Sequence, residues 1–383
     1  MHKPVPYRRK HTNEFAIGLK LETSRLVSNT TYLEEITLNL LLKDYLVRQV
    51  TPVAARLDSE PQLLFEAFHG LGDRTLLTPK LPAASGGLDL DTLGFWQFQA
   101  LIAQHSGALA FLQAQHQSAA SLLLSSQNRA IAQTYLPAMA SGAKRVGVGF
   151  SQLRRQPAPV QAQPVSGGYQ LSGTVPWVSG AALFTEFIGA AELADGSAIF
   201  GLLPLTNQST VSVSQPLALM GMAATGTVSV SLNNHFLANE QVVGIQAAGW
   251  IQSRDRANPL SPLGLILGCA QAGLDAATQL LSKRKISHPL LAQLQTQIEQ
   301  IWLDLPKAHA LPTAHYSQKV ALRGQAIATM NTCAQAAVLA ASGAANTVSH
   351  PAQRVYKEAL VFSVSGQSKG SAIASLDALY NYH

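Results

Sequence analysis

The spacing of the apolar residues changes twice along the chain, and this order of patterns constrains the fold more than any other feature. Before Gly142 the apolar residues recur at helical spacing, as in the run from Leu109 to Leu124. From Val146 to about Gly244 they alternate with polar residues between frequent Gly, Pro and Ser, which is typical of antiparallel strands. Helical spacing then returns. Because no strand–helix–strand repeat occurs, the pattern disfavours a parallel Rossmann sheet.

These patterns predict an α+β protein, because helices and strands fall in separate runs instead of alternating. The length of 383 residues exceeds what one simple core supports, so several subdomains are expected. The four expected segments are a polar N-terminal extension (1–31), an N-terminal helical domain (32–141), a central antiparallel, β-barrel-like domain (142–245) and a C-terminal four-helix bundle (246–383).

Proline and aspartate residues indicate where several helices begin or end. The amphipathic run at 32–50 predicts a helix that Pro52 interrupts. Pro61 opens the next helix, and Asp89 or Asp91 caps the one after it. The C-terminal helices are expected at 263–281, 288–305 and 316–345, with a fourth that opens at Pro351.

Composition limits the partners that the chain can have. Hydrophobic residues make up 47% and charged residues only 13%, which predicts a large subunit-facing surface and hence a homodimer or homotetramer. The net charge of +6 comes without dense basic tracts, so nucleic acid is not expected as a partner. No apolar run of about eighteen residues and no signal-peptide pattern occurs, so we expect a cytoplasmic protein that does not enter a membrane.

The stretch from Gly167 to Ala181 carries the clearest candidate binding residues. A hairpin turn at Gly167 precedes a short strand, Gly173 is expected to break it, and a second extended run ends at Trp177. Trp177 and Ser179 then point to the same face, because they are two residues apart. An indole beside a hydroxyl suits a flat polar ring. The alternative is a Trp buried in a β-core with a hydroxyl nearby.

Several common catalytic motifs are absent or incomplete. Gln152 stands where a dinucleotide fingerprint that starts at Gly147 needs its third glycine. The Gly-x-Ser-x-Gly match at 366–370 is rejected because only thirteen residues follow it, too few to place an acid and a histidine. Walker A, His-Glu-x-x-His and Cys-x-x-Cys patterns do not occur, and Cys269 and Cys333 are expected to be buried thiols. No metal site is therefore predicted.

Four short motifs, in this order and spacing, resemble the acyl-CoA dehydrogenase superfamily over about residues 32–376. In that family a Trp-x-Ser/Thr strand places both side chains against the flavin isoalloxazine ring, and an arginine that ends a helix meets the flavin phosphates. The matching positions are Trp177 with Ser179, the run 219–227 in which Ala223 replaces an arginine, Arg284 with Gln295, and the helix entry at 351–359. The resemblance implies a flavoprotein that binds FAD, with FMN as the alternative.

The resemblance also implies which residues hold the cofactor. The family places the helix-end arginine, here Arg284, against the cofactor of a neighbouring subunit. Pro157 and Ser342 replace a family serine and a family glycine, so contacts to the ADP part are less well kept than contacts to the ring. A small-molecule or acyl-thioester substrate is expected beside the flavin. The expected cofactor-binding residues are Phe150, Ser151, Trp177, Ser179, Arg284, Gln295, Gly343, Gln367 and Ser368.

The departure with the largest bearing on function is the missing base. Acyl-CoA dehydrogenation needs a carboxylate that removes the α-proton, but the family's glutamate position falls on Gly366 and its alternative position on Asn258. Asp255, about one helical turn earlier, would serve only if its helix began early, which Pro259 disfavours. Glu358 aligns with a structural acid and is expected on a helix surface or in a salt bridge. Ordinary α,β-dehydrogenation is therefore disfavoured.

Three hypotheses for function stay open. The first is a flavoprotein with altered chemistry, such as a monooxygenase relative, in which the flavin supplies the reactive atom. Its candidate steering residues are His116, Gln115 and Ser118, although a hydrogen-bonded helix histidine is the alternative for His116. The second hypothesis is a dehydrogenase with an unrecognised base, for which Asp255 is a candidate. The third is a non-catalytic scaffold that has lost flavin.

Overall fold

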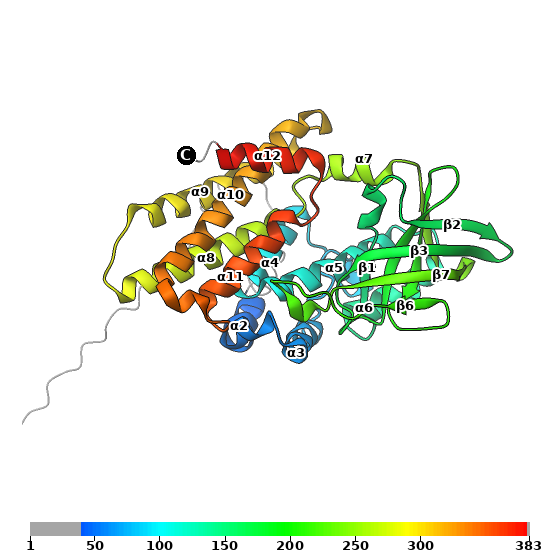
Figure 1. The fold of residues 1–383 in the computed structure, drawn as a ribbon, viewed down its shortest axis with the longest axis horizontal. Coiled ribbons are helices and arrows are strands. Elements are labelled where there is room, and N and C mark those ends of the chain that lie inside the picture. Colours follow the sequence, from blue (N-terminus) through cyan, green and yellow to red (C-terminus); the bar gives the residue numbers. More distant parts are fainter. Residues whose placement is uncertain (1–39, 381–383) are drawn as a thin grey trace, which may run out of the picture. The chain divides into compact units, whose positions relative to one another are not determined.

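The computed structural model describes residues 40–380, and Figure 1 shows the path of the chain. Contacts divide the chain into two compact units, Met1–Leu42 and Lys43–His383, and every element described below belongs to the second. The expected extension at 1–31 and the first part of the helix expected at 32–50 lie outside the described residues. Within the second unit a helical region, a sheet and another helical region follow one another, which confirms the α+β class.

The first helical region contains several short and long helices, some of which begin at a side chain that caps the helix. Its elements are η1 (Leu46–Val50, a π-helical turn), η2 (Thr51–Val53), α2 (Ala54–Leu57), α3 (Pro61–Gly72), η3 (Ala83–Ser85), α4 (Thr92–His105), α5 (Gly107–Leu124) and α6 (Arg129–Ala140). Asp91, and not Asp89, caps α4: its Oδ1 accepts a hydrogen bond from the N–H of Gly94 at 2.7 Å. Ser106 caps α5 through the N–H of Leu109 at 3.3 Å.

The central region forms one open sheet. Its strands are β1 (Val146–Gly149), β2 (Val160–Val165), β3 (Gly168–Val178), β4 (Glu186–Glu192), β5 (Ala198–Pro204), β6 (Val211–Val213), β7 (Val228–Ala238) and β8 (Val242–Gln246). They lie in the order β6-β7-β3-β2-β4-β5-β8, with β1 paired to β4. Among the described strands, β6 and β8 at the two ends do not pair, so the barrel does not close; β6 has only three residues, too few for a closing ladder. Most pairs are antiparallel as expected, but β1–β4 and β2–β4 are parallel.

Strand β3 runs unbroken through Gly173, where the sequence pattern predicts a break. Gly167 makes the expected hairpin turn with a φ of +79°. At Gly173 the strand shifts its register against β7, and this residue adopts a φ of +127°. A Cβ there would lie 2.0 Å from the carbonyl oxygen of Pro159, so only glycine fits. The unbroken strand carries Trp177 to the end of β3 opposite the hairpin.

Up to Tyr380, where the described residues end, the C-terminal region contains the four expected helices and two more, one at its start and one at its end. Its elements are α7 (Trp250–Ala257), α8 (Leu263–Lys283), α9 (Pro289–Ala310), η7 (Thr313–His315), α10 (Tyr316–Ala341), η8 (Ser342–Asn346), α11 (Pro351–Val364) and α12 (Lys369–Tyr380). Helices α8, α10 and α11 pack side by side, and α12, which was not expected, packs on α10 (Figure 1). Ser342 after α10 has a φ of +55° and a ψ of −144°, a conformation that suits the family's glycine at this position.

A buried ion pair within α11 also forms a hydrogen bond to the start of α5. Glu358 is fully buried, and its carboxylate accepts hydrogen bonds from Arg354 at 2.8 and 3.0 Å and from the N–H of Gly107 at 2.8 Å. Burial raises the pKa of Glu358, and Arg354 opposes that shift. A Cβ at Gly107 would lie 2.7 Å from Cδ of Glu358, so this close approach needs glycine. Glu358 is therefore the buried member of a salt bridge and not a surface acid.

Candidate functional site

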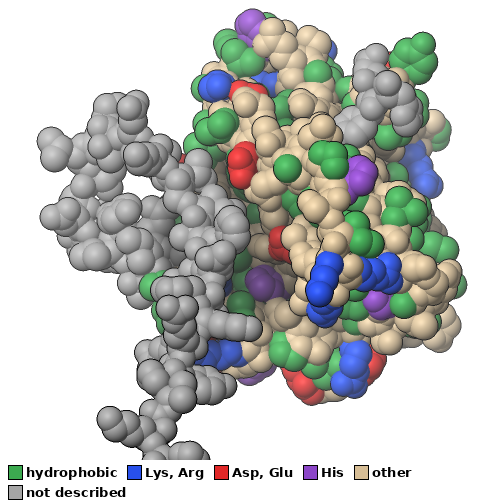
Figure 2. All heavy atoms as spheres, turned by 90° about the vertical axis from the view of Figure 1, so that its left-hand side faces the viewer, with side chains coloured by type: hydrophobic (Ala, Val, Ile, Leu, Met, Phe, Trp, Pro, Cys, Tyr) green, Lys and Arg blue, Asp and Glu red, His purple; other side chains and the backbone are tan. Residues whose placement is uncertain are grey.

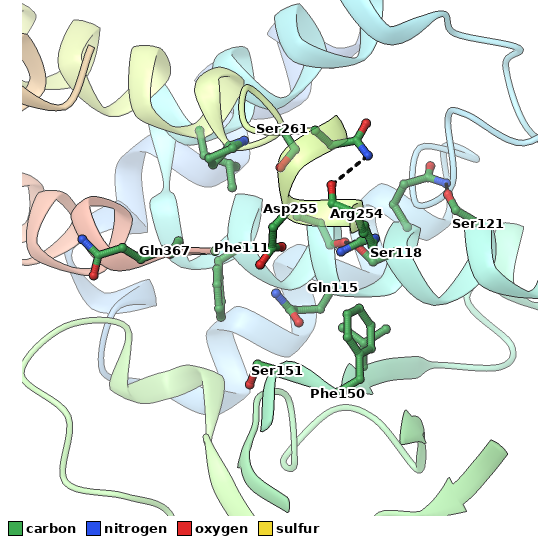
Figure 3. A pocket seen from close by; sticks show the side chains of 18 of the residues that line it. Phe111, Gln115, Ser118, Ser121, Phe150, Ser151, Arg254, Asp255, Ser261 and Gln367 are labelled. Atoms are coloured by element: carbon green, nitrogen blue, oxygen red, sulfur yellow. Dashed lines mark hydrogen bonds between the residues drawn. The ribbon is translucent and has the colours of Figure 1, made fainter. Parts of the chain in front are cut away.

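One large cavity of about 1170 Å³ lies where the helical regions meet the sheet. Helices α4 and α5 form one wall, the ends of β1 and β3 with the 219–227 loop form another, and α7 with the α11–α12 connection forms a third. Figure 3 shows the cavity from close by, with Phe111 and Gln115 on α5 and Asp255 on α7. The volume exceeds the roughly 300–1,000 Å³ typical for one ligand. The cavity therefore has room for a flat cofactor ring together with a substrate.

The ends of β1 and β3 supply an aromatic and hydroxyl surface to this cavity. Trp177 lines it and is 48% exposed, although β3 is an interior strand. Ser179, two residues on, also lines the cavity and is buried, and Phe150 and Ser151 line it from the end of β1. An indole face left open inside a cavity offers a stacking surface for a flat ring. The residues here thus fit the isoalloxazine part of a flavin.

Three hydroxyl groups form a network on the same wall. The Oγ of Ser179 lies 2.8 Å from Oγ1 of Thr227, and Oγ1 of Thr225 lies 3.3 Å from the same atom. The loop that carries both threonines is anchored by Asp58, whose Oδ1 accepts the N–H of Met222 at 2.6 Å. Neither threonine is predicted as a site residue from the sequence, although both lie in the run that resembles the family's flavin segment.

Gly366, the position that the resemblance aligns with the family's catalytic glutamate, carries no side chain. Gly366 lines the cavity between α11 and α12, and a Cβ built on it would meet no atom within 4 Å. Its φ of +59° is also one that glycine adopts most readily. Arg323 fixes this turn, because its guanidinium donates to the carbonyl of Ser365 at 2.7 Å and to that of Gly366 at 3.2 Å. The cavity thus has space, but no carboxylate, at this position.

Asp255 is the one carboxylate that the described residues bring to the cavity wall. Its helix, α7, ends at Ala257, so Pro259 does not prevent a helix here, contrary to the expectation. Both oxygens of Asp255 accept hydrogen bonds from Arg154, from Nε and from Nη2, each at 2.7 Å. This bidentate pair engages both oxygens, so Asp255 is a weaker candidate for a catalytic base than an unpaired carboxylate would be.

The expected cofactor-binding residues divide into two groups. Gln367 and Ser368 line the cavity beside Gly366, as the resemblance implies. None of Arg284, Gln295 and Gly343 lines it. Arg284 and Gly343 are exposed, and Nε2 of Gln295 donates to Glu299 on its own helix at 2.8 Å. The residues expected to meet the flavin ring therefore line one cavity. The residues expected to meet the rest of the cofactor lie outside that cavity.

His116, a candidate catalytic residue, lies outside the cavity. Its ring is fully buried between Phe68 and Phe184, at centroid distances of 5.6 and 5.9 Å. Nε2 lies 3.0 Å from the carbonyl oxygen of Met139, and Nδ1 lies 3.0 Å from the carbonyl oxygen and 3.3 Å from the backbone nitrogen of Val146. Both ring nitrogens therefore contact backbone groups of the core, and burial disfavours the charged ring. The structure removes His116 from the catalytic candidates and favours the hydrogen-bonded helix histidine.

The burial of His116 predicts a loss of stability on acidification. Burial lowers the pKa of its ring to about 4, below the ordinary value of 6.5. Between these two values the unfolded chain binds a proton that the folded protein does not bind. The free energy of unfolding therefore decreases by up to about 3 kcal/mol as the pH is lowered from about 6.5 to about 4. Urea unfolding near pH 7 and near pH 4 measures this loss, which should be smaller in His116→Gln. Equal losses in the two proteins would mean that another group is responsible.

Gln115 and Ser118 of α5 do line the cavity, as the first hypothesis requires. Ser121 and Ser125 continue the same helical face, although neither is predicted as a site residue. The sequence contains a pattern that could have identified them, because they follow Gln115 at intervals of three or four residues, which places them on the same side of a helix. Arg254, on α7, also lines the cavity and is missed by the sequence patterns.

Two helical regions and a sheet around one cavity, with Trp177 and Ser179 on its wall, define the class: this is the acyl-CoA dehydrogenase fold. Residues 34–143 match the family described as acyl-CoA dehydrogenase, N-terminal domain. The structure of a glutaryl-coenzyme A dehydrogenase in complex with glutaryl-CoA matches with a TM-score of 0.76 at 19% identity, over 94% of this chain and 96% of that one. The match over residues 34–143 and the shared fold of the chain together support the acyl-CoA dehydrogenase superfamily.

Two further relatives have names that describe other chemistry or other ligands. The amino sugar nitrososynthase RubN8 of Streptomyces rubradiris is 24% identical over 266 residues, which cover 65% of this chain and 62% of that protein, less than two thirds of its length. A structure of KijD3 with FMN and dTDP-3-amino-2,3,6-trideoxy-4-keto-3-methyl-D-glucose has a TM-score of 0.71 at 19% identity, over 93% of this chain and 94% of that one. At these identities the structural likeness establishes the fold alone.

Two negative findings concern residues 40–380. No helix there combines the length and the apolar composition needed to cross a membrane. No three His, Cys, Asp or Glu side chains there lie where they would hold a metal ion together. Cys269 and Cys333 are buried free thiols, as expected.

Trp177→Ala is expected to weaken flavin binding. The change removes a stacking surface worth about 1 kcal/mol or more, so the dissociation constant for FAD should rise about fivefold or more. Fluorescence titration of the flavin-free protein measures this constant. Phe236→Ala is the matched control, because Phe236 is 49% exposed on β7 of the same sheet but does not line the cavity. Equal weakening in both variants, or none in Trp177→Ala, contradicts a stacking role.

Proposed function

We propose that this protein is a flavin-dependent oxygenase with the acyl-CoA dehydrogenase fold, and that it does not dehydrogenate acyl thioesters. The observation that supports this most strongly is Gly366, with open space around it, at the position of the family's glutamate. Dehydrogenation requires a carboxylate that removes the α-proton, whereas in oxygenation the flavin supplies the reactive atom. A dehydrogenase that uses Asp255 is disfavoured, because Arg154 holds both oxygens of that carboxylate.

The proposed cofactor is FAD, with FMN as the alternative. Trp177 offers its open face to the isoalloxazine ring, and the hydroxyls of Ser151 and Ser179 are available to its polar edge. The likeness to KijD3, whose structure contains FMN, supports the alternative. A flavin held by these residues would supply monooxygenation, in which two electrons from a reductant allow one atom of molecular oxygen to enter the substrate while the other leaves as water. Chromatography of flavin released by heat distinguishes the two cofactors.

The likeness to an amino sugar nitrososynthase supports oxygenation as the class of reaction. A nitroso group carries oxygen on nitrogen, so that protein's name describes the addition of oxygen to an amine. We take from it the class of reaction alone. The electrons would come from a reduced nicotinamide, either directly or through a separate reductase that supplies reduced flavin.

The spectrum and oxygen reactivity of the purified protein test this proposal. We expect flavin absorption in the visible region, either as purified or after addition of FAD or FMN. After photoreduction without air, admission of oxygen should restore the oxidised spectrum within seconds. A colourless protein that binds neither flavin would support the non-catalytic scaffold instead, and a reduced flavin that stays reduced in air would overturn the oxygenase proposal.

A complete site is proposed to need two copies of the chain. Arg284, Gln295 and Gly343, which are expected to meet the phosphate and adenine end of the cofactor, all lie outside the cavity of their own chain. On the face drawn in Figure 2, apolar side chains are scattered among polar and charged ones. Light scattering should therefore give at least twice the chain mass of 40.7 kDa. A stable monomer at micromolar concentration contradicts this expectation.

A further inference from the structure

We propose that the substrate of this cavity is a phosphorylated, hydroxyl-rich molecule of the sugar phosphate class. Its phosphate binds Arg254, and its hydroxyl groups bind the polar face of α5. The inference rests on the oxygenase function proposed above and names the substrate class for it. The parts of the wall that such a molecule would meet are the polar residues of α5 and the cationic side chain of Arg254.

The face of α5 that lines the cavity is polar over most of its length. Its polar lining residues are Gln115, Gln117, Ser118 and Ser121, followed by Ser125 just beyond the helix, and its apolar ones are Phe111, Ala114 and Leu122. In Figure 3 the side chains of Gln115 and Ser118 reach from α5 into the cavity that Arg254 and Asp255 of α7 also line. The amide of Gln115 forms no hydrogen bond with any residue that the structure describes. It is therefore available to a ligand.

The serine hydroxyl groups on this face of α5 can each form a further hydrogen bond with a ligand. Ser118 Oγ donates to the carbonyl oxygen of Ala114 at 2.8 Å, so its lone pairs stay free to accept. Ser121 Oγ accepts from Gln117 at 3.2 Å, so its proton stays free to donate. A methylene chain laid along this face would remove water from these groups without replacing its hydrogen bonds, which is unfavourable. Hydroxyl groups on a ligand would replace them.

The charged groups on the cavity walls favour an anion. Asp255 is the one acid among the described lining residues, whereas the cations are Lys80, Arg154, Arg254, Lys319 and Arg323. Three of these cations are already engaged, with Asp255 or with backbone carbonyl oxygens. The side chains of Arg254 and Lys80 form neither a hydrogen bond nor an ion pair with any residue in the described part of the chain. Two cations therefore stay available for an anionic ligand.

Arg254 is the better placed of the two for a phosphate. Its Cζ lies 5.3 Å from the ring centroid of Phe150 and 5.5 Å from that of Trp250, so two aromatic rings hold the guanidinium. Burial lowers the pKa of Arg254, and Asp255, which is paired with Arg154, offsets this only in part. Two parallel hydrogen bonds from the planar guanidinium match the geometry of a phosphate group.

Calorimetric titration of the flavin-loaded protein tests the proposal. Glucose 1-phosphate and dTDP-glucose represent a free and a nucleotide-linked sugar phosphate, inorganic phosphate represents a bare anion, and octanoyl-CoA represents an acyl thioester. We expect at least one sugar probe to bind about tenfold or more tightly than inorganic phosphate and than octanoyl-CoA. If glucose 1-phosphate binds more tightly than dTDP-glucose, the substrate is a free sugar phosphate. The reverse order identifies a nucleotide-linked sugar.

Variants of the two proposed contacts sharpen the test. Arg254→Gln should weaken binding of the sugar probe about 10- to 100-fold, and Gln115→Leu about tenfold. Arg256→Gln is the matched control: Arg256 lies on the same helix and over an aromatic ring, with its Cζ 5.5 Å from the centroid of Tyr316, but it does not line the cavity. This control should leave the affinity unchanged.

Several results would contradict the proposed substrate class or its proposed contacts. If neither sugar probe binds, or if octanoyl-CoA binds more tightly than both, the substrate class is wrong. If inorganic phosphate binds as tightly as the sugar probes, the polar face of α5 does not recognise the ligand. If Arg256→Gln weakens binding as much as Arg254→Gln, the effect is one of general charge. Because no turnover is involved, the oxygenase proposal fails separately, through reduction of the flavin by octanoyl-CoA.

Discussion

Flavin-loaded wild-type protein should keep its oxidised absorption when it is mixed with excess octanoyl-CoA without air, and Gly366→Glu should gain slow bleaching. In the wild type no carboxylate stands at Gly366, and Asp255 is held by Arg154. A glutamate at this position enters open space and supplies a base for the α-proton. A positioned base typically accelerates proton transfer by about 10²- to 10⁴-fold, so even an imperfect one is measurable by stopped-flow absorbance.

The matched control for this experiment is Gly366→Gln. The φ of +59° at Gly366 costs any residue with a Cβ about 1–2 kcal/mol, and glutamine bears that strain with nearly the volume of glutamate but no carboxylate. Bleaching in both variants would reflect an altered cavity and not a restored base. Prompt bleaching of the wild type would refute the oxygenase proposal and direct attention to Asp255, with Asp255→Asn as the next variant.

Arg354→Leu should lower the free energy of unfolding by about 3–5 kcal/mol. Glu358 is fully buried, and without Arg354 its remaining partner is the N–H of Gly107. A buried carboxylate that loses its cation keeps the cost of leaving water and loses the attraction that offsets it. Denaturation by urea, followed by circular dichroism, measures the change.

The pair formed by Arg56 and Glu60 provides the control. It has the same residue types at the same spacing of four residues, but it is exposed. Arg56→Leu should therefore have a much smaller effect than Arg354→Leu. The double variant Arg354→Leu with Glu358→Leu should recover most of the lost stability, because it removes the buried charge altogether. Similar losses in the two arginine variants would show that burial of the pair does not govern its contribution.

Local patterns in the sequence were sufficient to locate the helical and strand regions. The predicted change at Gly142 lies between α6, which ends at Ala140, and β1, which begins at Val146. Helical and strand spacing depend on neighbours along the chain, so a single sequence carries them. Closure of the sheet depends instead on pairing between β6 and β8, and no local pattern records whether two distant edges meet.

The candidate site was predicted in part, and the limit is visible on one helix. Gln115 and His116 are adjacent in the sequence but about 100° apart around α5, so one lines the cavity and the other lies in the core. Both faces of α5 carry polar side chains, so their pattern did not show which face meets the cavity. Contacts between distant segments were equally hidden: the ion pair of Arg154 and Asp255 joins residues 101 positions apart.

The close approach of Gly107 to Glu358 couples the evolution of two positions that are 251 residues apart. A mutation that adds a Cβ at Gly107 would bring it to 2.7 Å from Cδ of Glu358, so it is tolerated only after the long side chain has gone. A mutation that shortens Glu358 first leaves Arg354 buried without its carboxylate. Every single-step path therefore passes through a destabilised intermediate, and among homologues we expect the three positions to change together or to stay as they are.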